Sequence, residues 1–403
     1  MEEKKLNIGI FIDTFFPMVD GVVSVVDNYA RLLSEKANVT VFTIKTKKQF
    51  DDSTLPYKVV RCKSVRVLNL DYSLGTPQFD NKFRKAVKNA NLDIVHIHSP
   101  FSIGKTGLKY AKKHHIPVVA TLHSQFKQDF LLDAKSKLIA KMLLDGVVRV
   151  FNKCDELWTM NSACAELART YGYKGEIKIV PNATNLTNDF TERDVNNAKH
   201  ELQKKYNISD DERILLSIGR VNRLKNIGFS LDVCKELSNR NFKYKFLIVG
   251  DGNDKKLFVE KTKRLGLEDS VVFTGKIVEQ SEKKKIFAAA DLHVFPSYYD
   301  TDGIVKIEAS AFNLPTIFAK GSLASSSVDD NVSGYIGEND VKQFADRIME
   351  VFEDTNTYAK VKENCKKVLY KHWNEVVDLV YNNYIDLIGK NNKWKRKKSS
   401  LLF

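Results

Sequence analysis

Short apolar segments alternate with longer amphipathic segments along nearly the whole chain, and this alternation restricts the fold more than any other feature. The first half carries seven apolar segments, at residues 6–12, 39–44, 58–60, 94–97, 118–122, 156–160 and 177–180. Between them lie helical patterns such as Val22–Ser34, where valines and leucines recur at helical spacing. Near-continuous apolar strands separated by helices are typical of a parallel sheet that is covered on both faces.

The second half repeats this architecture after an interruption. A polar stretch at residues 181–194 and one helix ending near Tyr206 precede new apolar segments at 214–218, 244–249, 271–273, 292–295 and 316–318. The sequence therefore predicts an α/β protein with two doubly wound, Rossmann-like domains. Ligands of such sheets bind at the carboxyl ends of the strands, so two facing domains would form a cleft between those ends.

Composition narrows the class of protein and of partner. The chain has 403 residues, of which 43% are hydrophobic and 28% charged, and these proportions argue against disorder, collagen and coiled coil. A net charge of +14 favours an anionic partner: nucleic acid, an acidic membrane surface or a phosphorylated substrate. Five scattered cysteines indicate reduced thiols in the cytoplasm, and no apolar stretch is long enough to span a bilayer. We expect a soluble or membrane-surface protein.

The strongest local motif follows the apolar segment 292–295. Asp300 and Glu308 bracket a glycine, Gly303, and a helix is predicted to begin near Ile304. Gly303 permits a tight strand-to-helix turn, and the first amides of a helix suit an anion. Glu308 would lie inside the helix, where its carboxylate meets ligand hydroxyls, although a capped and solvated helix start is the simpler alternative.

A second motif follows the first strand of the second half. Arg220 comes directly after Gly219, and Lys225 follows five residues later. A planar guanidinium and a mobile ammonium together suit a diphosphate. The alternative is a pair of solvated surface cations, but the glycine at the strand end favours a functional role.

In the first half, Asp20 and Gly21 end a loop and open a helix, where backbone can approach a phosphate closely. His96, His98 and His123 lie in or just after two predicted strands, and His123 is the best placed for a ligand. Zinc requires three or four convergent ligands, and nothing at familiar spacing completes such a set. We therefore expect no metal.

Taken together, these segments resemble a retaining glycosyltransferase of family four, whose GT-B fold places two Rossmann-like domains around an interdomain cleft. Within that family, the chain resembles the bacterial lipid (diacylglycerol) glycosyltransferases. The matching segments occur in the family's order between residues 6 and 335: Phe16-Pro17, Asp20-Gly21-Val22, residues 93–98, Thr121-Leu122-His123, Val180-Pro181-Asn182, Gly219-Arg220, Lys225-Asn226, residues 249–252 and the turn from Asp300 to Glu308.

The resemblance implies an N-terminal acceptor-binding domain at residues 1–190 and a nucleotide-sugar-binding domain at 191–375. Residues 376–403 would form a terminal helix that packs back on the first domain, followed by a basic tail. The donor would be a nucleotide-sugar, such as a UDP-hexose, serving as substrate. No cofactor or catalytic metal is implied.

Site residues of the second domain follow from the same resemblance. Arg220 and Lys225 would neutralise the donor diphosphate as the leaving group departs, a purely electrostatic role. Glu308 would hold the ribose, and Asp300 would lie near the transferred sugar. The amides of Gly303, Ile304 and Val305 would contact sugar and phosphate.

The first domain would contribute three further residues. Gly21 would let backbone approach the phosphates, and Asn182 matches a substrate-binding position. His123 would lie beside the anomeric centre and help to stabilise an oxocarbenium-like state. Front-face attack with the departing phosphate as base would retain the anomeric configuration.

The chain departs from the family pattern at three positions. Asp300 replaces the usual Glu, Asp302 precedes Gly303 where an uncharged residue is common, and Asn313 stands where Gly is common. The first two leave the identity of the sugar open. Asp300-Thr301-Asp302 also reads as the DxD metal signature of the other main glycosyltransferase fold, but its place beside Arg220 and Lys225 argues against that reading.

The basic surplus gathers in two segments away from these motifs. Leu131–Lys153 combines apolar residues with lysines in a pattern suited to an amphipathic helix on an anionic bilayer, or to a core-facing helix with a solvated face. The segment Lys390–Phe403 is predicted to be a flexible polybasic arm for the same surface, or a solubilising tail.

The leading prediction is a peripheral enzyme that transfers a hexose to a lipid such as diacylglycerol at the cytoplasmic membrane face. A transferase that builds capsular, teichoic or other cell-surface polysaccharide is the alternative. A nucleic-acid-binding protein is disfavoured because no such motif appears. A catalytically inert partner subunit also stays open because of Asp300 and Asp302.

Overall fold

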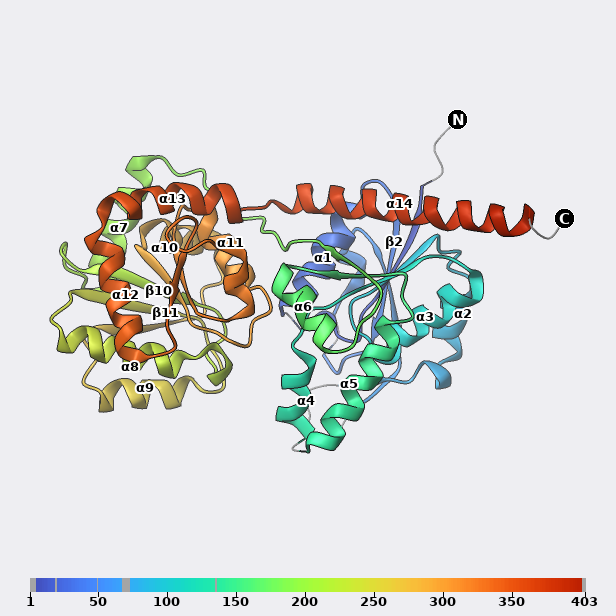
Figure 1. The fold of residues 1–403 in the computed structure, drawn as a ribbon, viewed down its shortest axis with the longest axis horizontal. Helices are drawn as coiled ribbons and strands as arrows, with labels where there is room; N and C mark the ends of the chain where they lie inside the picture. The colour runs from blue at the N-terminus through green and yellow to red at the C-terminus, as the bar shows by residue number, and fades with distance from the viewer. Residues whose placement is uncertain (1–4, 19, 49, 67–72, 135, 401–403) are drawn as a thin grey trace. The chain divides into compact units, whose positions relative to one another are not determined.

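The computed structural model describes residues 5–18, 20–48, 50–66, 73–134 and 136–400, with side chains as far as Asn392. The chain forms two compact units, Met1–Asn182 with Trp373–Phe403 and Ala183–His372. Each unit has a parallel sheet with helices on both of its faces (Figure 1). The predicted α/β class with two Rossmann-like domains is confirmed, although the first unit ends earlier than the limit predicted at residue 190.

The first unit is built on a seven-stranded sheet with the order β3-β2-β1-β6-β7-β8-β9. All seven strands were predicted from the apolar segments: β1 Asn7–Phe11, β2 Asn38–Ile44, β3 Lys58–Cys62, β6 Ile94–Ile97, β7 Val118–Thr121, β8 Glu156–Thr159 and β9 Glu176–Ile179. A short antiparallel ribbon of β4 (Ser64–Arg66) and β5 (Ser73–Gly75) was not predicted. Its strands are too brief to show an apolar pattern.

The helices of the first unit are α1 Gly21–Ser34, α2 Asn81–Lys88, α3 Ser102–His114, α4 Phe126–Ala134, α5 Lys137–Phe151, α6 Ser162–Thr170 and α14 Trp373–Ser400. Polar side chains cap the starts of α1, α2, α5 and α6. Asp20 caps α1 by accepting a hydrogen bond from the amide of Val23 at 2.8 Å. The cap fixes the first helix directly after the loop that follows β1.

The single amphipathic helix predicted at Leu131–Lys153 is wrong, because the segment belongs to two helices, α4 and α5. Ser136 interrupts it and caps α5, accepting a hydrogen bond from the amide of Ile139 at 3.5 Å. A serine at this position satisfies a free amide at a helix start and so favours a new helix over continuation. Lys135 lies outside the described residues.

The second unit has a six-stranded parallel sheet with the order β12-β11-β10-β13-β14-β15. Five strands match the prediction and β15 was missed: β10 Arg213–Ile218, β11 Tyr244–Val249, β12 Val271–Gly275, β13 Leu292–Phe295, β14 Thr316–Ala319 and β15 Tyr335–Gly337. The helices are α7 Glu192–Tyr206, α8 Ile227–Asn239, α9 Lys255–Arg264, α10 Gln280–Ala289, α11 Ile304–Ala311, α12 Val341–Glu353 and α13 Thr355–Leu369. Short 3₁₀ turns lie at η3, Arg223–Lys225, and η4, Leu323–Ser327.

Strand order places one switch point in each sheet. In the second unit the chain runs outward from β10 to β12 and then returns to β13 on the other side of β10. In the first unit the same reversal lies between β1 and β6. Loops diverge on either side of such a point, so each leaves room for a ligand there.

Buried apolar clusters cover both faces of the second sheet. Ile248 and Val294 belong to one cluster, whereas Leu216 and Val249 belong to the other. All five cysteines are free and buried, in agreement with the prediction of reduced thiols. Within the described part of the chain, no helix is long and apolar enough to cross a membrane.

The C-terminal segment differs from its prediction. The backbone continues as helix α14 through Ser400, where a flexible arm was expected from Lys390 onward. No proline interrupts residues 390–400, and lysine and arginine are good helix formers, so the helix extends. Side chains of residues 393–400 and all of residues 401–403 lie outside the described residues.

The departure at Asn313 has a simple backbone explanation. Asn313 adopts the left-handed conformation, with a φ of 56°, at the end of α11. Glycine is the usual residue there and asparagine is the common substitute. Its side-chain amide also donates to the carbonyl of Lys362 at 3.0 Å.

Candidate active site

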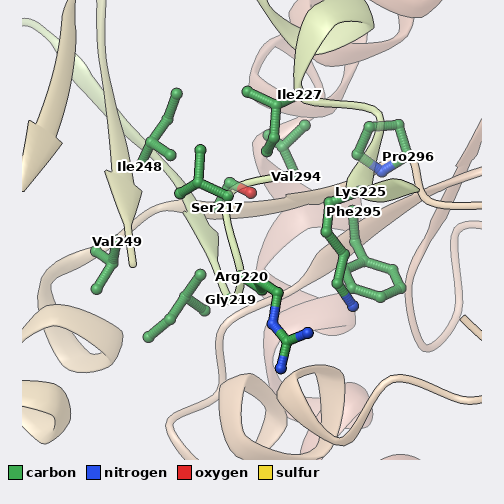
Figure 2. Close-up of a pocket in the computed structure, with 12 residues that line it drawn as sticks. Ser217, Gly219, Arg220, Lys225, Ile227, Ile248, Val249, Val294, Phe295 and Pro296 are labelled. Carbon is green, nitrogen blue, oxygen red and sulfur yellow. The ribbon is translucent and has the colours of Figure 1, made fainter. Parts of the chain in front are cut away.

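The loops that follow β10 and β13 form a pocket at the switch point of the second unit, and Arg220 and Lys225 line it. Figure 2 shows their charged heads on one side of the pocket, away from the apolar side chains of Ile227 and Val294. The sequence predicted both cations after this strand. Two cations therefore lie together at the position where open α/β sheets bind ligands.

Hydrogen bonds fix the loop that carries Lys225. The side chain of Asn222 accepts from the amide of Lys225 at 3.2 Å and so caps the η3 turn. Asn226 adopts a left-handed conformation and donates from its side chain to the carbonyl of Pro296 at 3.1 Å. The loop after β10 is thereby tied to the loop after β13.

Two glycines allow the loops after β10 and β11 to approach each other. Gly219 has a φ of 149°, and a Cβ added at Gly250 would lie only 1.8 Å from the carbonyl oxygen of Gly219. Neither position accepts an ordinary side chain. The glycine before Arg220 is thus required by the fold of the pocket itself.

Asp300 forms an ion pair with Lys225, one of the two cations that line the pocket. The distance from Lys225 Nζ to Asp300 Oδ1 is 2.5 Å, and the Asp300 side chain is 16% exposed. Its second oxygen, Oδ2, is buried and has no hydrogen-bond partner among the described residues. Burying a carboxylate oxygen without a donor is costly, so a ligand hydroxyl at this position would stabilise the site.

Gly303 caps α11, as the sequence predicted, with a φ of 75°. A Cβ at this position would lie 2.7 Å from the ring of Phe295, so only glycine fits. Gly303 has no side chain with which to cap the helix, in contrast to Asp20 at the start of α1. The amides of Ile304 and Val305 therefore start a helix whose positive end suits an anion or a polar ligand.

Asp302 and Lys306 form a buried ion pair across the first turn of α11. Lys306 Nζ lies 2.5 Å from Asp302 Oδ1, and the two side chains are 2% and 5% exposed. The ammonium also donates to Ser327 Oγ at 2.5 Å and to the carbonyl oxygen of Ala324 at 3.3 Å. The carboxylate before Gly303 therefore has a structural partner, and Lys306 ties α11 to η4.

Glu308 also has a lysine partner. Lys283 of α10 donates to Glu308 Oε1 at 2.7 Å, and the glutamate side chain is 14% exposed. The other carboxylate oxygen, Oε2, takes no part in this pair. Neither Lys283 nor Lys306 was predicted, because each is one lysine among many and only the fold places it beside a carboxylate.

His293 of β13 is buried, and it lies close enough to Lys225 for that charge to affect its pKa. Its Nδ1 lies 3.1 Å from Thr316 Oγ1. Burial, and then the charge of Lys225, lower the pKa of His293 to about 3. The ring is therefore neutral near pH 7.

Gly21 and Asn182 are the candidate residues at loop ends of the first unit. Gly21 is exposed at the start of α1, and a Cβ added there would meet nothing within 4 Å. Its lack of a side chain is thus required neither by packing nor by a left-handed backbone, which leaves close approach of a ligand as a reason for glycine. Asn182 is buried in the loop after β9.

Three histidines lie together at the ends of β6 and β7. The rings of His96 and His98 are 4.0 Å apart between centroids, because side chains two residues apart along a strand lie on the same side of the sheet. His98 Nδ1 lies 2.9 Å from His123 Nε2. Burial lowers the pKa of His123 to about 4, so this ring too is neutral near pH 7.

Two family models match the chain. The model described as glycosyltransferase family 4 matches residues 19–188, and the model described as glycosyl transferases group 1 matches residues 198–368. The chain is a glycosyltransferase of family four. Its two units together have the GT-B fold.

Two relatives align with almost the whole length of the glycosyltransferase. It is 28% identical to alpha-monoglucosyldiacylglycerol synthase of Streptococcus pneumoniae over 96% of this chain and 87% of that protein. It is 26% identical to the protein of the same name from Acholeplasma laidlawii, over 98% of this chain and 100% of that protein.

Solved structures share the fold. Anabaena HepE in complex with UDP and glucose superposes with a TM-score of 0.73, at 16% identity, over 94% of this chain and 99% of that one. Sucrose-phosphate synthase from Thermosynechococcus elongatus gives a TM-score of 0.78 at 19% identity, over 96% and 100% of the two chains. At these identities the likeness concerns the fold alone.

Within the second unit of this glycosyltransferase, Arg220 and Lys225 line the pocket and Asp300 pairs with Lys225, while Gly303 lies at the start of α11 and Glu308 inside it. The arrangement offers positive charge for a phosphate group, an unsatisfied carboxylate oxygen for a hydroxyl, and helix amides. Among the residues described, no cluster of three or more His, Cys, Asp and Glu has the geometry of a metal site. In the DxD triplet, Asp300 forms an ion pair with Lys225 and Asp302 forms one with Lys306.

Proposed function

We propose that this glycosyltransferase moves a hexose from a UDP-hexose to a lipid acceptor, diacylglycerol or a similar lipid, with retention of anomeric configuration, at the cytoplasmic face of the membrane. The observation that carries the donor half of this proposal is the pairing of Arg220 and Lys225 at the switch point of the second sheet. A diphosphate needs two such charges, and a leaving diphosphate needs them most in the transition state.

The donor would be held by groups that the pocket already presents. Arg220 and Lys225 would neutralise the diphosphate, and the first amides of α11 would add helix-end stabilisation. Asp300 Oδ2, which is buried without a partner, would accept a hydrogen bond from a sugar hydroxyl. Glu308 would bind the ribose hydroxyls while Lys283 holds its other oxygen.

Gly21, Asn182 and His123 of the first unit would act on the same donor and acceptor. Gly21 leaves open space for the phosphates, and the neutral His123 ring would lie beside the anomeric carbon. Neutrality matters because a cationic ring would oppose an oxocarbenium-like state. The cations of the pocket replace a catalytic metal in this scheme.

The acceptor class is supported by the relatives and by a surface of the first unit. Both named relatives are alpha-monoglucosyldiacylglycerol synthases. On α5, Leu138 is 78% and Met142 60% exposed, and Leu132 on α4 is 57% exposed. Lys137 and Lys141 lie on the same helix as Leu138 and Met142 and are exposed too. Apolar side chains set among lysines suit the interface of an anionic bilayer.

The C-terminal half of α14 would add to this attachment, since residues 393–398 hold five Lys and Arg and one Trp. A juxtamembrane cation contributes about 1 kcal/mol on an anionic surface. Such attachment would bring the enzyme to an acceptor that is insoluble in water.

One experiment tests donor, acceptor and stereochemistry together. Purified protein is incubated with UDP-[¹⁴C]glucose, UDP-[¹⁴C]galactose or GDP-[¹⁴C]mannose and with vesicles that contain diacylglycerol and an anionic lipid. We expect radiolabelled lipid with the UDP-hexoses only, EDTA without effect, and an α-linked product by NMR from the α-linked donor. Transfer only to soluble glycans would contradict the lipid acceptor, and a β-linked product would contradict retention.

A further inference from the structure

A ladder of aromatic and histidine side chains leads from the C-terminal helix to His123. Tyr384 of α14 lies with its hydroxyl 2.6 Å from His96 Nδ1. The His96 ring lies against that of His98, with centroids 4.0 Å apart and planes tilted by 37°, and His98 Nδ1 lies 2.9 Å from His123 Nε2. Every member of the ladder belongs to the first unit.

The far end of the ladder is rigidly packed. Tyr384 is fully buried, and its ring stacks on that of Trp158 with centroids 5.5 Å apart. His96, also fully buried, is held a second time because its Nε2 lies 2.7 Å from Thr121 Oγ1. Figure 1 shows the helix that carries Tyr384, in red, running beside α1. A close-packed interior of this kind transmits position from one ring to the next.

The surroundings of His98, in the middle of the ladder, determine which of its ring nitrogens carries the proton. A neutral imidazole has one N–H and one bare nitrogen. His98 is 3% exposed, and its Nε2 is buried without a hydrogen-bond partner in the described part of the chain. A buried N–H with no acceptor is among the rarest groups in folded proteins. The proton of His98 therefore belongs on Nδ1, from which it donates to His123 Nε2.

This donation decides the state of His123 as well. An Nε2 that accepts a hydrogen bond is bare, so the neutral ring carries its proton on Nδ1. The opposite tautomer would make His123 Nε2 the donor and would leave a protonated, unpartnered Nε2 on His98. Burial lowers the pKa of both His96 and His98 well below the usual range, which keeps the ladder neutral.

We propose that His98 is a positioning residue for His123, that it holds the His123 ring in place with the proton on Nδ1, and that Tyr384 of α14 anchors this arrangement through His96. The inference rests on the role proposed above for His123 at the anomeric centre. It gives the C-terminal helix a part in catalysis, because Tyr384 of that helix supports His123, a residue of the N-terminal half of the chain.

The tautomer of His123 is tested by NMR spectroscopy, which needs no activity assay. The protein is labelled with ¹⁵N-histidine, and the ring resonances of His123 are assigned from the signal lost in His123→Gln. We expect the pattern of a neutral ring with a protonated Nδ1 and a bare Nε2. In His98→Leu the ring should populate both tautomers. The exposed His115, replaced as His115→Asn, is the control and should leave the His123 signals unchanged.

Positioning is tested by a conservative pair of variants. His98→Asn places an amide nitrogen where Nδ1 stood and keeps the donor, whereas His98→Leu keeps the bulk and removes it. We expect His98→Asn to retain kcat within about threefold and His98→Leu to lose about 10²-fold, with the donor KM nearly unchanged, because a misplaced group affects the transition state. Tyr384→Phe should lower kcat by a smaller factor at an unchanged melting temperature.

The outcomes separate this inference from the proposed function. A protonated Nε2 on His123, or equal losses in His98→Asn and His98→Leu that follow a fall in melting temperature, would overturn the positioning role. A wild-type protein that transfers no sugar in the vesicle assay would overturn the proposed function, while the NMR signature would still decide the ladder.

Discussion

Lys225 Nζ and Asp300 Oδ1 lie 2.5 Å apart, so the cation proposed for the diphosphate is paired with the carboxylate proposed for the sugar. The pair is only partly buried, with side chains 26% and 16% exposed. Each charge holds the other in the pocket before a donor arrives. Binding a diphosphate would then exchange one anionic partner of Lys225 for another and avoid desolvating a bare ammonium.

Replacement of either pocket cation should strongly slow the transfer of the sugar from its nucleotide donor. We expect Arg220→Ala and Lys225→Ala each to lower kcat by about 10²- to 10³-fold, since each removes charge stabilisation of the leaving diphosphate. Arg223→Ala is the matched control: Arg223 lies in the same η3 turn, but its side chain is 74% exposed and pairs with Asp254. UDP release in the presence of acceptor measures the effect, and full activity in both pocket variants would refute the diphosphate clamp.

The length of the carboxylate at Asp300 should set sugar preference. Asp300→Asn should lower kcat/KM for every hexose by about tenfold or more, because it weakens a charged hydrogen bond to a hydroxyl and the pairing of Lys225. Asp300→Glu keeps the charge and restores the usual family length, so the ratio of kcat/KM for UDP-glucose and UDP-galactose should shift more than either value. An unchanged ratio in Asp300→Glu would mean that this carboxylate does not read the sugar.

Breaking the buried pair of Asp302 and Lys306, at the first turn of α11, should destabilise the second unit. Asp302→Leu or Lys306→Met alone leaves one buried charge without its partner and should cost about 3–5 kcal/mol of the free energy of unfolding. The double variant should recover much of that loss. Urea unfolding measures all three, and additive losses in the double variant would contradict the pairing.

An exposed pair provides the control for that series. Lys320 and Glu338 form an ion pair with side chains 62% and 47% exposed. Lys320→Ala should leave the free energy of unfolding almost unchanged, because an exposed ion pair contributes little to stability.

Acid should destabilise the protein through its buried neutral histidines. The folded-state pKa is lowered to about 3 for His293 and about 4 for His123, whereas an unfolded histidine titrates near the usual 6.5. Between those values the unfolded state binds more protons, so the free energy of unfolding falls as the pH falls below 6.5, by up to about 1.4 kcal/mol per pH unit for each group. Urea midpoints from pH 7.5 to 5 measure this slope, and His293→Asn should reduce it.

Membrane attachment should depend on exposed apolar residues of α5. Leu138→Ser with Met142→Ser should weaken sedimentation with anionic vesicles by about tenfold or more, because both side chains lose apolar surface that would enter the bilayer interface. Leu257→Ser on α9, where the leucine is 42% exposed, is a control in the second unit. Binding should also fall with salt, and equal binding of all variants to the anionic vesicles would contradict the interface.

Local patterns in the sequence predicted the strands and the positions of the motifs. The segment 244–249 became β11 without change, because five of its six residues are apolar and the strand is buried along its whole length. Gly303 and Ile304 mark the start of α11 as expected, because a left-handed turn and a following helix are encoded by neighbouring residues. The resemblance then placed Arg220, Lys225, Asp300 and Glu308 in order.

Side-chain partners were decided by the tertiary structure. The sequence showed Asp302 as an anomaly, and only the fold brought Lys306, Ala324 and Ser327 around one ammonium. It showed His98 and Tyr384 far apart, and only the return of α14 to the first unit joined them through His96. Periodicity reports which face of an element is buried. Which charges meet inside depends on strand order and loop closure, and those belong to the whole chain.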